Sequence, residues 1–328
     1  MAGIDFKLEQ KKVNNCMEVI MNKTKVYELL NQIVGKEHVL LDELMSKHTT
    51  FKIGGPADIF VVPKTVEEVK AIIDVCKNEN IDFYVIGKGS NLLVGDKGFR
   101  GVIICLYNTL DNVKIVDNNE DTSVIAGAGI MLSKLANIIA DNNLEGFEFA
   151  SGIPGTLGGA VTMNAGAYGG EINDCIVAAT VMDRSGNVIR LEREVLELGY
   201  RKSIVMKEQY IVLEAEFVFK KGDNKAIVEK MCELNKRRKD KQPLEYPSAG
   251  STFKRPEGYF AGKLIMDSGL AGYAVGDACV STKHCGFVIN NGKATAKDVR
   301  QLMTDVDNKV FENYGVHLEP EVRMIGEF

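Results

Sequence analysis

Apolar residues recur along the chain at spacings that predict alternating strands and helices. Within residues 65–80 they follow a helical period behind Thr65, whose side chain is suited to cap a helix. A second helix is predicted over 24–46, beginning at Thr24 and broken at Gly35. Three apolar runs predict buried strands: 57–62, 81–87 and 101–106. The first hundred residues therefore predict a small βαβ unit.

Both strands and helices are also predicted in the rest of the chain. Strands are predicted at 112–117, 122–127, 175–183, 187–191 and 210–219, and helices at 131–143, 224–239 and about 295–313. The basic run NKRRKDKQP (235–243) is predicted to be a solvated helix end, where cations favour the helix dipole. Pro243 and Pro247 then indicate a boundary. With 328 residues, the chain fits two or three domains.

Residues 150–170, ASGIPGTLGGAVTMNAGAYGG, break the periodic pattern. The segment holds seven glycines and one proline, with almost no charge. A flexible linker would be polar, whereas this run carries side chains that favour burial, such as Ile153 and Leu157. Glycine-rich apolar backbone can approach a large flat ligand closely, and this is the interpretation we favour. A tightly packed turn region is the alternative.

Composition narrows the class of protein. A net charge of −5 argues against general nucleic-acid binding. Seven scattered cysteines without a CxxC pair argue against a disulfide framework and fit a reducing cytoplasm. No run approaches 18 apolar residues, and the N-terminal segment lacks the apolar core of a secretory signal. We therefore expect a cytoplasmic protein that partners neither nucleic acid nor membrane.

The familiar phosphate and metal motifs are absent. Gly87-Lys88-Gly89-Ser90-Asn91-Leu92 has the first two glycines of a dinucleotide fingerprint but not the third, and no helical pattern follows it. No GK[ST] triplet exists, and the four histidines have no metal-site spacing, so no metal is expected. What remains is a turn after a strand, whose N–H groups could cradle a pyrophosphate.

Three residues are candidates for chemistry, and each has an ordinary alternative. Arg201 in GYRKS could be a surface ion pair, Ser251 in AGSTFKRP a turn cap, and Glu321 in LEPEVR a solvated carboxylate. Taken singly, spacing favours the ordinary interpretation of each.

Taken together, six segments resemble the MurB family of flavin-dependent UDP-N-acetylenolpyruvoylglucosamine reductases. They are TTFKIGGPAD (49–58), VIGKGSNLL (85–93), SGIPGTLGGAVTMNAGAYGGEI (151–172), GYRKS (199–203), AGSTFKRP (249–256) and LEPEVRMIG (318–326). The spacing between the GYRKS and AGSTFKRP blocks is short. In this respect the chain resembles the compact second type of the family, which lacks a substrate-capping loop and its tyrosine.

The resemblance implies an FAD-binding fold of the para-cresol methylhydroxylase type with two subdomains, plus a C-terminal α+β substrate-binding domain. The expected bounds are a poorly ordered segment at 1–23, FAD-binding subdomains at 24–106 and 107–239, and the substrate-binding domain at 240–328. The resemblance also implies non-covalent FAD, NADPH as co-substrate, and a monomeric protein.

The site residues follow from the same resemblance. Arg201, Ser251 and Glu321 are the expected catalytic residues. The expected FAD contacts are Ile86, Gly87, Lys88, Gly89, Ser90, Asn91, Leu92, Gly152, Ile153, Gly158, Gly159, Thr162, Gly166 and Ala167, with the pyrophosphate at 87–91 and the ring along the glycine-rich segment. Tyr168, Lys254 and Arg255 are expected to contact substrate.

The implied mechanism passes hydride from NADPH to flavin and then to C3 of the enol ether. Arg201 would hold the substrate carboxylate, Glu321 would assist in polarising it, and Ser251 would deliver a proton to C2. Two other functions are kept open. One is a small-alcohol oxidase on the same fold, often with covalent flavin; the other is a flavin- or nucleotide-binding protein without turnover, including a nucleotide-sugar binder.

Overall fold

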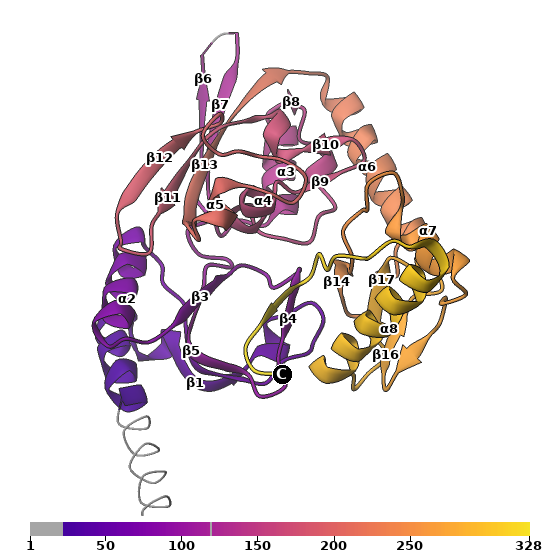
Figure 1. The fold of residues 1–328 in the computed structure, drawn as a ribbon. Helices are drawn as coiled ribbons and strands as arrows, with labels where there is room; N and C mark the ends of the chain where they lie inside the picture. The colour runs from indigo at the N-terminus through magenta and orange to yellow at the C-terminus, as the bar shows by residue number, and fades with distance from the viewer. Residues whose placement is uncertain (1–21, 119) are drawn as a thin grey trace, which may run out of the picture.

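The computed structural model describes residues 22–118 and 120–328, which form three modules around a common centre (Figure 1). Most of the segment expected to be poorly ordered, residues 1–21, lies outside the described residues. The first module is the indigo and purple part of Figure 1, the second lies above it, and the orange and yellow third module lies beside both.

The first module is a four-stranded sheet with one crossover helix, as the apolar runs predict. Its strand order is β1-β2-β5-β3, and both β2 and β3 run parallel to β5. Helix α2 (Val66–Asn78) begins at Thr65, whose hydroxyl accepts a hydrogen bond from the Glu68 N–H at 3.1 Å. The strands are β1 (Val39–Leu44), β2 (Pro56–Val61), β3 (Phe83–Ile86), β4 (Leu92–Val94) and β5 (Phe99–Cys105).

The prediction of one helix over 24–46 is wrong beyond residue 34. The described chain is already helical at residue 22, so Thr24 lies inside the helix, which ends at 34. Gly35 follows with φ of 88°, a conformation that ends a helix readily only at glycine. The segment after it becomes β1, which pairs antiparallel with β2. Apolar spacing could not reveal this, because the hydrogen-bond partner lies on another strand.

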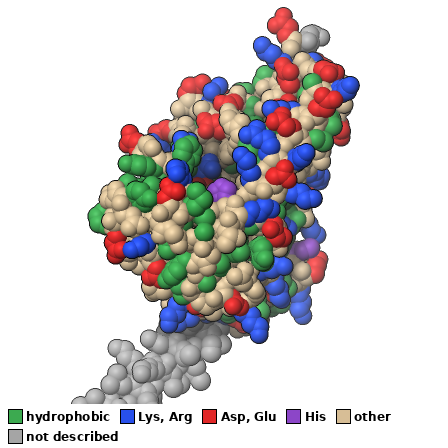
Figure 2. All heavy atoms as spheres, turned by 90° about the vertical axis from the view of Figure 1, so that its right-hand side faces the viewer, with side chains coloured by type: hydrophobic (Ala, Val, Ile, Leu, Met, Phe, Trp, Pro, Cys, Tyr) green, Lys and Arg blue, Asp and Glu red, His purple; other side chains and the backbone are tan. Residues whose placement is uncertain are grey.

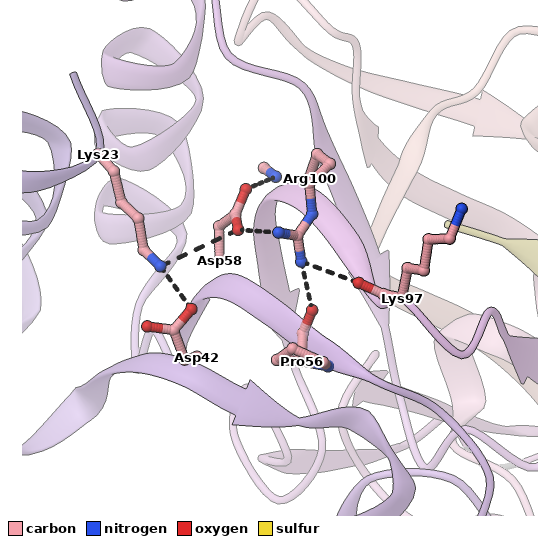
Figure 3. A network of polar contacts seen from close by, with 7 residues as sticks. Lys23, Asp42, Pro56, Asp58, Lys97 and Arg100 are labelled. Atoms are coloured by element: carbon pink, nitrogen blue, oxygen red, sulfur yellow. Dashed lines mark hydrogen bonds and ion pairs between the residues drawn. The ribbon is translucent and has the colours of Figure 1, made fainter. Parts of the chain in front are cut away.

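A charged network joins the N-terminal helix to this sheet (Figure 3). The carboxylate of Asp58 on β2 accepts from Arg100 Nη1 at 2.9 Å and from the Gly101 N–H at 3.0 Å. Lys23 of the helix lies 4.0 Å from Asp58 and 2.5 Å from Asp42. Asp58, the last residue of TTFKIGGPAD, therefore ties three elements of the first module together.

The second module is an antiparallel sheet of order β12-β11-β13-β7-β6, with β8 paired to β13. Helices α3 and α4 pack against it, around a core that includes the edge-to-face rings of Phe147 and Phe217. The elements are β6 (Val113–Asp117), β7 (Thr122–Gly127), α3 (Leu132–Asp141), β8 (Leu144–Glu145), α4 (Leu157–Met163), β9 (Gly166–Ala167), β10 (Gly170–Glu171), β11 (Ile176–Met182), β12 (Val188–Glu192), α5 (Ile204–Lys207), β13 (Ile211–Lys221) and α6 (Asn224–Lys241).

The third module is a small antiparallel sheet of order β14-β17-β16-β15, with α7 and α8 packed beside it (Figure 1). Thr295 and Asp298 form a capping box at the start of α8. The elements are β14 (Ser248–Ser251), α7 (Ala261–Asp267), β15 (Ala274–Val275), β16 (Ala278–Val280), β17 (Phe287–Asn290), α8 (Ala296–Tyr314) and β18 (Arg323–Ile325).

The chain then returns to the first module. Strand β18 pairs parallel with β4, so residues near the C-terminus complete a two-stranded sheet with the segment that follows the GKGSN turn. Nothing in the sequence pattern predicts this pairing, because three-residue strands have no usable periodicity. The predicted first and third domains are thereby joined beside the loop that the sequence assigns to a phosphate.

Candidate active site

A cavity of about 730 Å³ lies where the three modules meet. Its walls come from β3 and the turn after it, from the glycine-rich segment, from β14, and from the C-terminal segment before β18. Figure 2 shows the molecule hollowed on the face that carries the third module, with Lys or Arg side chains in the hollow. A volume of this size fits a large organic cofactor or substrate.

The turn after β3 presents free backbone donors to this cavity. Within the described chain, the N–H groups of Lys88, Gly89 and Ser90 donate no hydrogen bond to another protein group. Gly89 has φ of 65°, and a Cβ there would lie 2.1 Å from the His48 carbonyl oxygen. A side chain is therefore excluded, and the turn packs against residues 48–50 with its amides free. Such a nest suits an anionic group such as a diphosphate.

Glycines of the 150–170 segment serve two different ends. A Cβ on Gly158 would lie 3.0 Å from the Ala128 side chain, so this glycine lets α4 pack against the end of β7. A Cβ on Gly159 would have only the Thr156 hydroxyl near it, at 3.8 Å, and Gly159 lines the cavity. Gly159 therefore leaves space that a larger side chain would fill, as a close-lying flat ring requires.

Arg201 and Glu321, which are 120 residues apart in sequence, form an ion pair at the cavity wall. Their side chains are 20% and 10% exposed. Arg201 sits in a tight turn with φ of 52°, which two hydrogen bonds between Gly199 and Lys202 close at 3.1 Å each. Ser203 anchors the turn by donating to the Thr162 carbonyl at 2.6 Å. The GYRKS block thus fixes one guanidinium against α4.

Ser251 is the last residue of β14 and also lines the cavity. The strand bulges before it at Gly250, which has φ of 77°. The next residue, Thr252, is buried, and its carbonyl accepts from the Glu321 N–H at 2.8 Å. Its hydroxyl accepts from Val288 N–H at 2.9 Å. Thr252 therefore holds Ser251 beside Glu321, a positioning role that the sequence does not reveal.

Most of the predicted site residues line the cavity. Four do not, and the structure shows where each of them lies. Gly152 does not line it; a Cβ there would lie 2.5 Å from Asn235, so this glycine serves packing against α6. Tyr168 lies outside the wall, with the Arg237 guanidinium 4.9 Å from its ring centroid. Lys254 pairs with Glu319, and Arg255 lies over Phe260. These last three remain candidates for substrate contact at the rim.

Arginines that the sequence does not single out also line the cavity, at positions 184, 238 and 323. The basic run at 235–243 was predicted to be solvated, and this is wrong for Arg238. Burial lowers the pKa of Arg238, and within the described chain its guanidinium has no carboxylate partner. Together with Arg201, these cations favour a ligand with several negative charges. Helical spacing could not identify Arg238, because neighbouring basic residues on α6 are exposed.

Other cofactor classes find less support in the described part of the chain. No described helix has the length and apolar character needed to cross a bilayer. No group of three or more His, Cys, Asp or Glu side chains in the described residues could hold a metal ion.

The free amides of the 87–91 turn, the space over Gly159 and the arginine-rich wall suit a flavin dinucleotide. Fold and site together define a flavin-dependent oxidoreductase.

Comparisons with known proteins agree with that class and narrow it. Residues 57–192 match the family described as "FAD binding domain", and residues 242–325 match "UDP-N-acetylenolpyruvoylglucosamine reductase, C-terminal domain". The chain belongs to the UDP-N-acetylenolpyruvoylglucosamine reductase family. The expected α+β fold, an FAD-binding unit followed by a C-terminal domain, is thereby confirmed.

Relatives cover nearly the whole chain. A reductase of this name from Lachnoclostridium phytofermentans is 58% identical over 94% of this chain and 99% of its own length. One from Clostridium novyi is 54% identical over 91% of this chain and 95% of its own. The crystal structure of the Thermus caldophilus enzyme (MurB) superposes with a TM-score of 0.71 at 34% identity, covering 88% of this chain and 98% of that one.

Proposed function

We propose that this chain reduces the enolpyruvyl ether of UDP-N-acetylenolpyruvoylglucosamine to UDP-N-acetylmuramate in peptidoglycan precursor synthesis. FAD is the bound cofactor and NADPH the electron donor. The convergence of Arg201, Ser251 and Glu321 on one cavity, beside a cradle suited to a flavin, supports this function most strongly. The family to which the chain belongs has the same named activity.

Bound FAD supplies the hydride chemistry, and the protein supplies binding, orientation and a proton. The turn at 87–91 would hold the diphosphate through its free amides. Gly159, together with Ile153, Gly166 and Ala167, would face the ring. Arg238 and Arg323 would counter the remaining phosphate charge of cofactor or substrate.

Arg201 would bind the carboxylate of the substrate. Its guanidinium stays charged at neutral pH and presents paired donors that match a carboxylate. As the substrate accepts hydride, negative charge grows on that carboxylate and on the neighbouring carbon. A fixed cation beside it lowers the barrier without reorganising. The turn closed by Gly199 and Lys202 supplies this fixed position.

The ion pair with Arg201 indicates that Glu321 orients the arginine. Its carboxylate accepts from the Arg201 Nε, so in this arrangement it is an orienting partner of the arginine. Two main-chain contacts fix the glutamate itself, one to Thr252 and one to Asn91. We therefore propose that Glu321 aims the guanidinium at the substrate carboxylate and polarises it through Arg201.

Ser251 would hold the proton that the substrate takes up at C2. Its hydroxyl makes no hydrogen bond to another described residue, and Ser251 lines the same cavity as Arg201 and Glu321. A free hydroxyl is a weak acid, so the growing negative charge on the substrate must draw the proton from it. The proton would return from solvent after each turnover.

The deciding experiment is anaerobic NADPH consumption by purified holoenzyme, with and without UDP-N-acetylenolpyruvoylglucosamine. We expect substrate-dependent oxidation far beyond one equivalent per flavin. Reduction of bound flavin without substrate-dependent turnover would contradict the proposed activity. Flavin that stays with the protein after denaturation would instead favour a covalent-flavin oxidase.

We further propose that the enzyme acts as a monomer in the cytoplasm. The six cysteines within the described chain are all unpaired, which suits a reducing compartment. Light scattering after size exclusion should give a mass near 36.0 kDa plus the flavin; twice that mass would contradict the monomer.

A further inference from the structure

The tip of the β11–β12 hairpin crosses from the second module onto the first. Met182, at the base of the tip, is fully buried in the same core as Val69 and Ile73 of helix α2. A Cβ on Gly186 would lie 3.3 Å from the Lys70 side chain. The two modules are therefore packed together at this point.

The tip has a fixed backbone. The Asp183 carboxylate accepts from the N–H groups of Ser185 and Asn187 at 2.7 and 2.9 Å, and from the Asn187 side chain at 2.8 Å. Gly186 supplies a φ of 87°. A turn closed by so many local hydrogen bonds holds the residue between them, Arg184, at a defined position.

Arg184 extends from this turn over Phe83. Its guanidinium carbon lies 4.0 Å from the centroid of the ring, and both residues line the cavity. Phe83 is the first residue of β3, and the residue is 8% exposed. Within the described chain no carboxylate oxygen lies within 4.0 Å of Arg184, so its contact with Phe83 is not explained by an ion pair.

The cavity follows β3 from Arg184 to the catalytic residues. β3 is the edge strand of its sheet, with β5 on only one side, and Asp82 to Ile86 line the cavity. The phosphate turn follows at its carboxyl end, and Asn91 then contacts Glu321. The order along this wall is therefore Arg184 and Phe83, the phosphate turn, and the catalytic residues.

That order assigns the parts of the cofactor. If the diphosphate occupies the turn and the reactive ring lies toward Arg201 and Ser251, the adenosine half must extend along β3 toward Phe83. We propose that Arg184 closes this adenosine end, and that its stacking on Phe83 makes a flat, cationic wall that retains FAD by its adenosine half. Guanidinium groups stack on aromatic faces, a geometry that a lysine cannot reproduce. The assignment rests on the proposed placement of FAD.

The test uses apoprotein of the parent chain and of Arg184→Ala, Arg184→Lys and Arg190→Ala, titrated with FAD and with FMN by flavin fluorescence. Arg190 lies on the next strand and pairs with Glu192 and Glu216, away from the cavity, so it is the matched control. We expect Arg184→Ala and Arg184→Lys each to raise the Kd for FAD about tenfold and to speed its release. Arg190→Ala should change the Kd for FAD less than twofold. The Arg184 substitutions should change the Kd for FMN, which lacks the adenosine half, less than twofold.

Three results would overturn this assignment: an unchanged Kd for FAD in Arg184→Ala, an equal loss of FMN affinity, or full recovery in Arg184→Lys. Thermal unfolding of the apoproteins shows whether the variants fold as the parent does. Phe83→Leu is a second variant, which keeps apolar volume but removes the ring, and it should weaken FAD to a similar extent. If the parent turns over normally and Arg184→Ala binds FAD as tightly as the parent does, the adenosine assignment is wrong while the proposed function stands.

Discussion

The Asn91 side-chain amide, in the turn after β3, donates a hydrogen bond to the main-chain oxygen of Glu321 at 3.0 Å. In the same place the Arg323 N–H donates to the Asn91 carbonyl at 3.0 Å. One residue thus joins the proposed phosphate turn to the segment that carries the proposed catalytic carboxylate of Glu321. The parallel pair of β4 and β18 continues this junction.

Asn91→Ala should weaken cofactor binding and catalysis together. It leaves the part-buried Glu321 carbonyl without this partner, at the scale of a typical intramolecular hydrogen bond, about 1 kcal/mol. We expect the Kd for FAD to rise and kcat at saturating FAD to fall about tenfold. Flavin titration and steady-state kinetics measure the two effects. A change in FAD affinity with parental kcat would show that Glu321 does not depend on this bond.

Ser251→Ala should slow substrate reduction by about 10²-fold or more, which is the scale of a lost general acid. Reduction of the flavin by NADPH should remain close to that of the parent, because no substrate proton is needed there. Stopped-flow absorbance separates the two half-reactions. Ser248→Ala, three residues earlier on β14, is the matched control and should leave both rates unchanged. Normal turnover in Ser251→Ala would rule out the assigned role.

Gly159→Leu should yield folded protein without flavin. A Cβ there meets only the Thr156 hydroxyl, at an ordinary contact distance of 3.8 Å, and Gly159 lines the cavity, so the added side chain has room to enter it. The flavin absorbance per protein should fall to near zero, while the melting temperature stays at that of parental apoprotein. Gly158→Val should also lose flavin but melt at lower temperature, because its Cβ meets Ala128 at 3.0 Å. Stoichiometric FAD in Gly159→Leu would contradict the placement of the ring.

Asp58→Asn should destabilise the first module by about 1–3 kcal/mol, because Arg100 loses a charge-assisted partner. Urea unfolding followed by circular dichroism measures the change. Asp42→Asn is the comparison: this carboxylate is 63% exposed and pairs with Lys23, so its loss should change stability by less than about 1 kcal/mol. Equal effects of both substitutions would show that the network around Asp58 adds no stability of its own.

Lys88→Met should raise the pKa of Tyr107. The Lys88 ammonium donates to the Tyr107 hydroxyl at 3.0 Å, and this hydrogen bond holds the pKa of the phenol below its ordinary value. A lowered pKa adds stability only where the phenol ionises, so it adds none at pH 7 and increasing stability as the pH rises toward 10 and beyond. Carbon-13 NMR of labelled tyrosine follows the titration. An unchanged Tyr107 titration in Lys88→Met would refute this coupling.

The sequence predicts the longer helices of the second and third modules well, but it does not predict the short elements α4, α5 and α7. Apolar periods locate α3, α6 and α8, and the strands predicted at 175–183 and 187–191 correspond to β11 and β12. The helix predicted over 24–46 fails because apolar spacing cannot distinguish a helix from an edge strand such as β1. Arg238 is missed for a related reason: a basic run looks solvated unless a neighbouring module covers one of its members.

The amino-acid sequence alone determines the local features of the site and fold. These are the capping Thr65, the glycine-containing turn at 87–91, and the glycines that leave room over α4. Motif resemblance identified the family and the three catalytic candidates. Tertiary structure alone decided that Arg201 and Glu321 meet, that Thr252 sets Ser251 beside them, and that Arg184 lies over Phe83. Such contacts join residues that are far apart in sequence, two of them across modules, and their distances depend on how the chain packs, which no local pattern of side chains encodes.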